Sequence, residues 1–115
     1  MKLNEITYAE GTPVDGYGPG FFRIGGDVVE GALLLLPTGL TAWGGYADTS
    51  VILSAEIDVL FVGTGADIAP VPPEFRKAVE AAGMGVEIMN SPTACRTYNV
   101  LLSEGRRIGL ALLPV

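Results

Sequence analysis

The stretch that decides the fold is residues 57–63, IDVLFVG, a nearly continuous apolar run. A strand with one solvated face alternates apolar and polar residues, whereas a strand that is covered on both faces does not. Strands of the second kind belong to parallel sheets that carry helices on both faces. We therefore expect residues 57–63 to form a central strand of an α/β domain.

The segment after this strand shows a helical period. Pro72 and Pro73 precede EFRKAVEAAG, residues 74–83, where apolar side chains recur at spacings of three and four residues. Gly83 stands where a glycine commonly follows the end of a helix. The pattern predicts a helix that packs one apolar stripe against the sheet.

Two more strands and a second helix complete the C-terminal half. GVEIM at 85–89 and RIGLALLPV at 107–115 predict strands, and a helix is expected from about Pro92 to Glu104 with Ser91 as its N-cap. Strand–helix–strand–helix–strand order implies right-handed crossovers and a parallel core. On a helical wheel one face collects Ala94, Tyr98, Leu101 and Leu102 with Cys95 at its edge, whereas Arg96, Asn99 and Ser103 point away.

The N-terminal half is typical of β structure. A turn at 25–27, Gly-Gly-Asp, separates two apolar runs, and Pro-Thr-Gly at 37–39 precedes a short expected strand over 40–43. YGPG at 17–20 is rich in glycine and proline and is expected to be a loop. Residues 47–56 predict a short helix capped by Asp48 or Thr49, with a strand as the alternative.

Composition suggests a face that is covered by protein. Charged residues make up 17% of the 115-residue chain, against about 25% in average soluble proteins, while hydrophobic residues make up 49%. So little charge covers the surface poorly, which indicates an oligomer or a protein-binding face. The net charge of −6 and the scattered basic residues disfavour nucleic-acid binding.

The expected location is the cytoplasm. A single cysteine forbids an internal disulfide, as is usual in reducing compartments. Residues 1–11, MKLNEITYAEG, contain no apolar core of a secretory signal, and the longest aliphatic run, 32–36, is too short to insert into a membrane.

Much catalytic chemistry is excluded by residue types that the chain lacks. It has no histidine, so Ser-His and Cys-His dyads cannot form, and with one cysteine the usual zinc sites cannot form either. Glu56 and Asp58 are interpreted as a solvated or capping pair of carboxylates. No catalytic residue, metal or cofactor is predicted.

One polar corner remains as a candidate ligand site. The loops after strands 57–63 and 85–89 should meet at the carboxyl edge of the sheet. This would gather Gly63, Thr64, Gly65, Asn90, Ser91, Thr93 and Arg96. Ile68 stands where a dinucleotide fingerprint needs its third glycine, so a tight turn at 63–65 is favoured over nucleotide binding. Arg96 either pairs with Asp58 or Asp67, or holds an anion at the helix start.

Four stretches in order along the chain resemble a known family. They are YGPGFFRIGG at 17–26, GALLLLPTG with a following Trp43, DVLFVGTGA at 58–66, and the C-terminal segment 95–115. Together they resemble the MTH-type domain of unknown function, a family that includes a mitochondrial respiratory complex I assembly factor. The resemblance implies a single three-layer α/β domain over residues 1–115, with a mixed central sheet and an additional N-terminal β-hairpin layer. It brings no catalytic residues.

These observations favour a non-enzymatic interaction or assembly module of bacterial type that binds a protein partner. The alternative is a small-anion or metabolite-binding protein, or an enzyme, with its site at the carboxyl edge. A homo-oligomer that covers its own apolar face is a third possibility.

Overall fold

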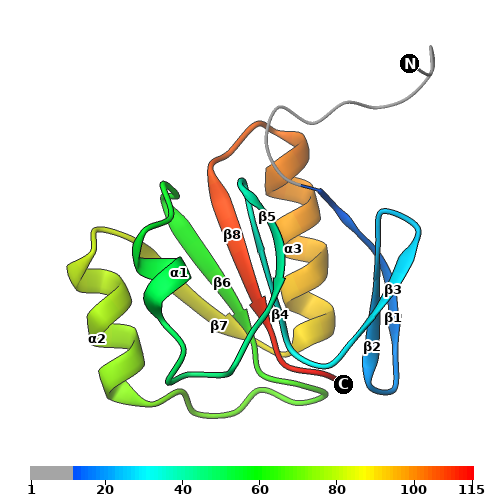
Figure 1. Ribbon diagram of the computed structural model, residues 1–115, viewed down its shortest axis with the longest axis horizontal. Helices are drawn as coiled ribbons and strands as arrows, with labels where there is room; N and C mark the ends of the chain where they lie inside the picture. The colour runs from blue at the N-terminus through cyan, green and yellow to red at the C-terminus, as the bar shows by residue number, and fades with distance from the viewer. Residues whose placement is uncertain (1–11) are drawn as a thin grey trace.

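The apolar strand predicted at 57–63 lies inside a mixed five-stranded sheet, as Figure 1 shows. In this computed structural model, which describes residues 12–115, β6 (Val59–Gly63) pairs in parallel with β8 (Ile108–Leu112) and with β7 (Gly85–Met89). β4 (Leu33–Leu36) runs antiparallel to β8, and β5 (Gly39–Ala42) continues from β4 as an edge strand. The strand order β5-β4-β8-β6-β7 confirms the predicted parallel core and mixed sheet. The stretch 1–11, for which no secretory signal is predicted, lies outside the described residues.

Helices cover both faces of this sheet (Figure 1). The short α1 (Ser50–Leu53) and α2 (Pro73–Ala81) contribute to the core on one face, and α3 (Ser91–Ser103) contributes to the core on the other. The helical interpretation of 47–56 is confirmed over α1, and Thr49 is its N-cap residue. Gly83 follows α2 with a φ of 94°, as expected for a glycine just beyond a helix end.

A second, three-stranded sheet lies beside α3. β1 (Val14–Gly18), β2 (Phe21–Ile24) and β3 (Asp27–Glu30) form an antiparallel meander, one strand more than the predicted hairpin. The prediction of a loop at 17–20 is wrong for its first two residues, which are the last two of β1. Gly18 pairs with Phe21 of β2, and its missing Cβ leaves the space that the Phe21 ring occupies.

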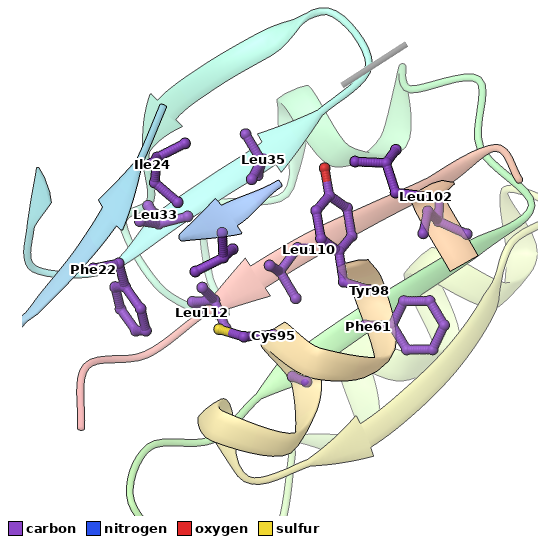
Figure 2. Packing of buried hydrophobic residues seen from close by; sticks show 13 residues of the cluster. Phe22, Ile24, Leu33, Leu35, Phe61, Cys95, Tyr98, Leu102, Leu110 and Leu112 are labelled. Carbon is purple, nitrogen blue, oxygen red and sulfur yellow. The ribbon is translucent and has the colours of Figure 1, made fainter. Parts of the chain in front are cut away.

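The central sheet separates two hydrophobic clusters, and β4 contributes to both. Leu33 and Leu35 face the cluster shared with α3 and the small sheet, whereas Leu34 and Leu36 face the cluster shared with α1 and α2. This explains why all four leucines of β4 are buried. Figure 2 shows the first cluster, in which Tyr98 and Cys95 lie as core residues, in agreement with the helical wheel.

Candidate functional site

The predicted polar corner forms where β6 and β7 end, and hydrogen bonds join its two loops. Thr64 N–H donates to the Met89 carbonyl at 3.0 Å, and Ser91 N–H donates to the Gly65 carbonyl at 2.8 Å. Gly65 N–H in turn donates to Ser91 Oγ at 2.9 Å. The structure therefore brings the 63–65 loop and the start of α3 together, as the parallel-sheet rule predicts.

Ser91 has a different position from the one that the sequence suggested. The N-cap of α3 is Asn90, whose Oδ1 accepts from Thr93 N–H at 2.8 Å. Ser91 is fully buried; its hydroxyl accepts from Gly65 and donates to the Leu113 carbonyl at 2.7 Å. Its hydroxyl thus links the β6 loop to the segment after β8, and this tertiary role replaces the local capping role.

The glycines of the corner are needed for close packing. A Cβ at Gly63 would stand 2.6 Å from Ser91 Oγ and 2.7 Å from Leu112 Cδ2. Gly65 has a φ of 108°, which side-chain-bearing residues rarely adopt. The Thr64 hydroxyl donates to the Asp67 carbonyl at 2.7 Å and accepts from Ala69 N–H at 3.0 Å. Thr64 therefore closes its own loop.

Arg96 is the exposed cation of the corner. Its Nη2 donates to Thr93 Oγ1 at 3.2 Å. The alternative of an ion pair with Asp58 or Asp67 is not realised within residues 12–115, since Asp58 accepts from Arg107 Nη2 at 3.1 Å and Arg96 has no carboxylate partner there. A shallow hollow of about 280 Å³ lies beside it on α3, lined by Arg96, Thr97, Val100 and Leu101. Ligand binding by the seven corner residues stays a prediction.

Another hollow, which the sequence did not indicate, lies elsewhere on the central sheet. Its volume is about 280 Å³, and its polar lining includes Thr38, Ser54, Glu56 and Arg107. These side chains come from the β4–β5 turn, the end of α1 and the residues before β6 and β8. Thr38, Arg107 and the 54–56 segment are far apart in the sequence, so no local motif could have revealed the hollow.

Cys95 is not available as a nucleophile. It is 3% exposed and packs in the cluster of Figure 2. Burial raises the pKa of its thiol from 9.0 to about 12, and the neighbouring Arg96 guanidinium offsets this only in part. Because the thiolate is the reactive form, the buried thiol stays inert near neutral pH.

Two further properties concern the described part of the chain as a whole. Between residues 12 and 115 no group of three or more acidic or cysteine side chains is placed to hold a metal ion. No helix in this range has the length and the apolar character to cross a membrane.

A mixed five-stranded sheet with helices on both faces and a small meander against α3 define a small α/β domain. The chain belongs to the family described as "Protein of unknown function (DUF498/DUF598)", whose model matches residues 14–113. Its fold is the Mth938-like fold. This confirms the MTH-type resemblance that the sequence motifs indicated.

The chain is also similar to curated proteins, among them assembly factors. An uncharacterized protein of Rhodobacter capsulatus is 46% identical over the whole of this chain and 94% of its own length. Assembly factor 3 of the NADH dehydrogenase [ubiquinone] 1 alpha subcomplex from Danio rerio is 35% identical over 99% of this chain and 71% of its own length.

Solved structures support the same fold. A Bordetella pertussis protein described as a Mth938-like domain has a TM-score of 0.76 at 29% identity, covering 99% of this chain and 92% of its own. A Bartonella henselae protein described as an outer membrane protein has a TM-score of 0.83 at 30% identity, covering 93% of this chain and 98% of its own.

Proposed function

We propose that this domain is a non-enzymatic interaction module that assists the assembly of a larger protein complex. The observation that carries the proposal is the 35% identity to a named assembly factor along 99% of the chain. At that level and coverage the two share a fold, and a shared mode of action is the simplest inference.

The geometry of the polar corner supports this reading. The Ser91 hydroxyl and the Thr64 hydroxyl both bond to backbone groups of their own domain. Catalysis needs groups that are free to meet a substrate and tuned for proton transfer or attack. The Cys95 thiol is buried, and its raised pKa keeps it in the unreactive protonated form.

Exposed apolar side chains lie on several elements of the described structure. Tyr17, Val28, Leu40 and Ile68 are each more than two-fifths exposed and belong to β1, β3, β5 and the loop before α2. With only 17% charged residues, the chain surrounds them with little charge. A partner that covered any of them would remove apolar area from water, which is favourable.

Affinity capture from cells of the native host tests the proposal. The tagged chain should retain a protein partner in a fixed ratio through stringent washing and size-exclusion chromatography. Recovery of the chain alone, as monomer or as homo-oligomer, in repeated captures would refute it. A homo-oligomer without other proteins would favour the alternative in which the chain covers its own apolar face.

The ligand-binding alternative rests on Arg96. Its guanidinium is exposed and has one hydrogen bond within residues 12–115, to Thr93, which leaves donors for an anion. Phosphate, sulfate and carboxylate metabolites should then raise the melting temperature. At a hundredfold excess over Kd, a bound ligand adds about 2.7 kcal/mol to the free energy of unfolding. A shift that survives Arg96→Ala, or no shift with any anion, counts against a site at this corner.

The cytoplasm of a bacterium remains the proposed location. The 46% identical relative from Rhodobacter capsulatus supports a bacterial source. Fractionation of native cells, probed with an antibody, should place the chain in the cytoplasmic fraction. Enrichment in an envelope fraction would overturn this part of the proposal.

A further inference from the structure

Strand β7 is an edge of the central sheet whose outer backbone groups are directed away from the other strands. Gly85 N–H donates to the Asp58 carbonyl at 2.8 Å and the Met89 carbonyl accepts from Thr64 N–H, so these two residues face β6. Successive residues of a strand alternate their backbone groups between the two sides. The N–H and C=O groups of Val86 and Ile88 therefore face outward, where the strand order ends (Figure 1).

This edge has little of the protection that natural proteins give to free strands. Its register with β6 is regular over all five residue pairs, so no bulge turns it aside. β7 contains no proline, and Glu87 is its one charged residue. Arg76 Nη2 donates to the Val86 carbonyl at a long 3.4 Å, and its side chain is exposed enough to move. Ile88 has no backbone partner on this side within residues 12–115.

An apolar groove runs beside the edge. It has a volume of about 400 Å³ and is lined by Ile68, Ala69, Pro70, Val71 and Ile88. Ile68 is 65% exposed, more than any other large hydrophobic residue among those described. Pro70 lacks an N–H and so offers no backbone donor that would compete with the edge. The groove lies on the side of the sheet to which Ile88 points.

Charge at the edge decides what can pair with it. Glu87 is exposed at the centre of β7, and it is in neither of the ion pairs formed among residues 12–115, Arg76–Glu80 and Arg107–Asp58. In a pair of antiparallel β7 strands, the register that uses both outward-facing residues sets Val86 against Ile88 of the other copy. Glu87 would then face its own counterpart, and like charges directly opposite each other are destabilising. The edge therefore disfavours a second copy of the chain.

We propose that β7 and its groove bind an extended, basic and apolar segment of a partner protein as a sixth strand. Alternate side chains of this segment would enter the groove beside Ile88, and Lys or Arg side chains between them would lie beside Glu87. Backbone bonds to Val86 and Ile88 would supply affinity that is independent of sequence. The inference rests on the proposed function, because it names the surface through which an interaction module would act.

A pair of synthetic peptides tests the chemistry directly. The isotope-labelled chain is titrated with capped Lys-Val-Lys-Val-Lys-Val-Lys and with its Glu-Val twin, and followed by NMR. The basic peptide should bind at least tenfold tighter than the acidic one and slow amide hydrogen exchange at Val86 and Ile88. Shifts confined to β5 or to the small sheet, equal affinities, or no binding would overturn the proposal.

Two variants and a control separate the edge from the rest of the molecule. Ile88→Pro removes an outward N–H while sparing the bonds to β6. Ile68→Lys places a cation in the groove. Each variant should bind the basic peptide at least tenfold more weakly. Val51→Lys, at an exposed position of α1 that does not line the groove, should leave the affinity unchanged. If Ile88→Pro does not fold, Ile68→Lys alone decides.

The outcome for β7 is distinguishable from that for the proposed function. If both variants capture a native partner as well as the unaltered chain does, the β7 placement is overturned and the interaction function stands. A chain that captures no partner refutes the function whatever the peptides do. A dimer seen by sedimentation that Ile88→Pro dissociates would assign the edge to a second copy and overturn the proposal.

Discussion

Asn99 of α3 holds Val14 of β1 through two hydrogen bonds. Its Nδ2 donates to the Val14 carbonyl at 2.8 Å, and its Oδ1 accepts from Val14 N–H at 2.9 Å. The side-chain amide thereby bonds to β1 as the peptide group of a neighbouring strand would. One residue earlier on the helix, Tyr98 Oη donates to the Thr12 carbonyl at 3.0 Å. α3 thus fixes the point where the small sheet begins.

Replacing Asn99 by alanine should loosen this attachment. The change leaves the partly buried N–H and C=O of Val14 without their partners, which costs about 2 kcal/mol. Urea denaturation followed by circular dichroism should show a lower midpoint at an unchanged slope. Ser103→Ala, at the exposed end of the same helix, is the control and should change stability by less than about 0.5 kcal/mol. Equal midpoints for both variants would contradict a structural role for Asn99.

The Ser91 hydroxyl should matter more than its size suggests. Ser91→Ala leaves the buried Gly65 N–H and the Leu113 carbonyl unsatisfied, so we expect a loss of about 1–3 kcal/mol. Thr93→Ala is the matched control, because the Thr93 hydroxyl bonds only to the exposed Arg96 in the described structure. A Thr93→Ala loss as large as that of Ser91→Ala would show that the corner is held together in another way.

Gly63 should not tolerate a methyl group. Gly63→Ala places a Cβ 2.6–2.8 Å from atoms of Ser91 and Leu112, two residues that lie in the interior. Overpacking of this kind typically costs about 1–3 kcal/mol. Gly16→Ala serves as the control, since no atom stands within 4 Å of its added Cβ and its φ is not positive. Thermal unfolding should show a lower Tm for Gly63→Ala alone; an unchanged Tm would mean that the corner adjusts freely.

The C-terminal half could be predicted from sequence because its signals are local and strong. The unbroken apolar run before Gly63 and the helical period after Pro73 need no knowledge of the rest of the chain. β1 was missed because glycine and proline argue against a strand, and only the neighbouring Phe21 ring shows why Gly18 belongs in one. Such a contact cannot be inferred from composition.

The candidate site was predictable in its location and not in its hydrogen bonds. The parallel-sheet rule brought the residues around Gly65 and Ser91 together correctly. Local capping preference assigned Ser91 to the helix end, yet bonds to two distant segments determine its position. The helical wheel assumed one buried face for α3, whereas the small sheet gives this helix a second contact surface that includes Asn99.

Stability should fall on the alkaline side because of Cys95. Burial raises the pKa of the folded-state thiol to about 12, against 9.0 for an exposed one. The unfolded chain therefore loses its proton first, and the thiol's contribution, complete below pH 9.0, declines as pH rises toward 12. Near pH 10.5 the loss should reach about 2 kcal/mol.

The variant Cys95→Ala isolates this effect. Burial also raises the pKa of Tyr98, but that residue is present in both proteins, so its contribution cancels in the comparison. Urea midpoints measured from pH 8 to about pH 10.5 should converge, because the unaltered chain loses stability faster than the variant does. At pH 8 a thiol reagent should label Cys95 only as fast as the chain unfolds, given that the side chain is 3% exposed. Parallel pH curves for the two proteins, or rapid labelling of the folded chain, would place the thiol in a more solvated site than the structure gives it.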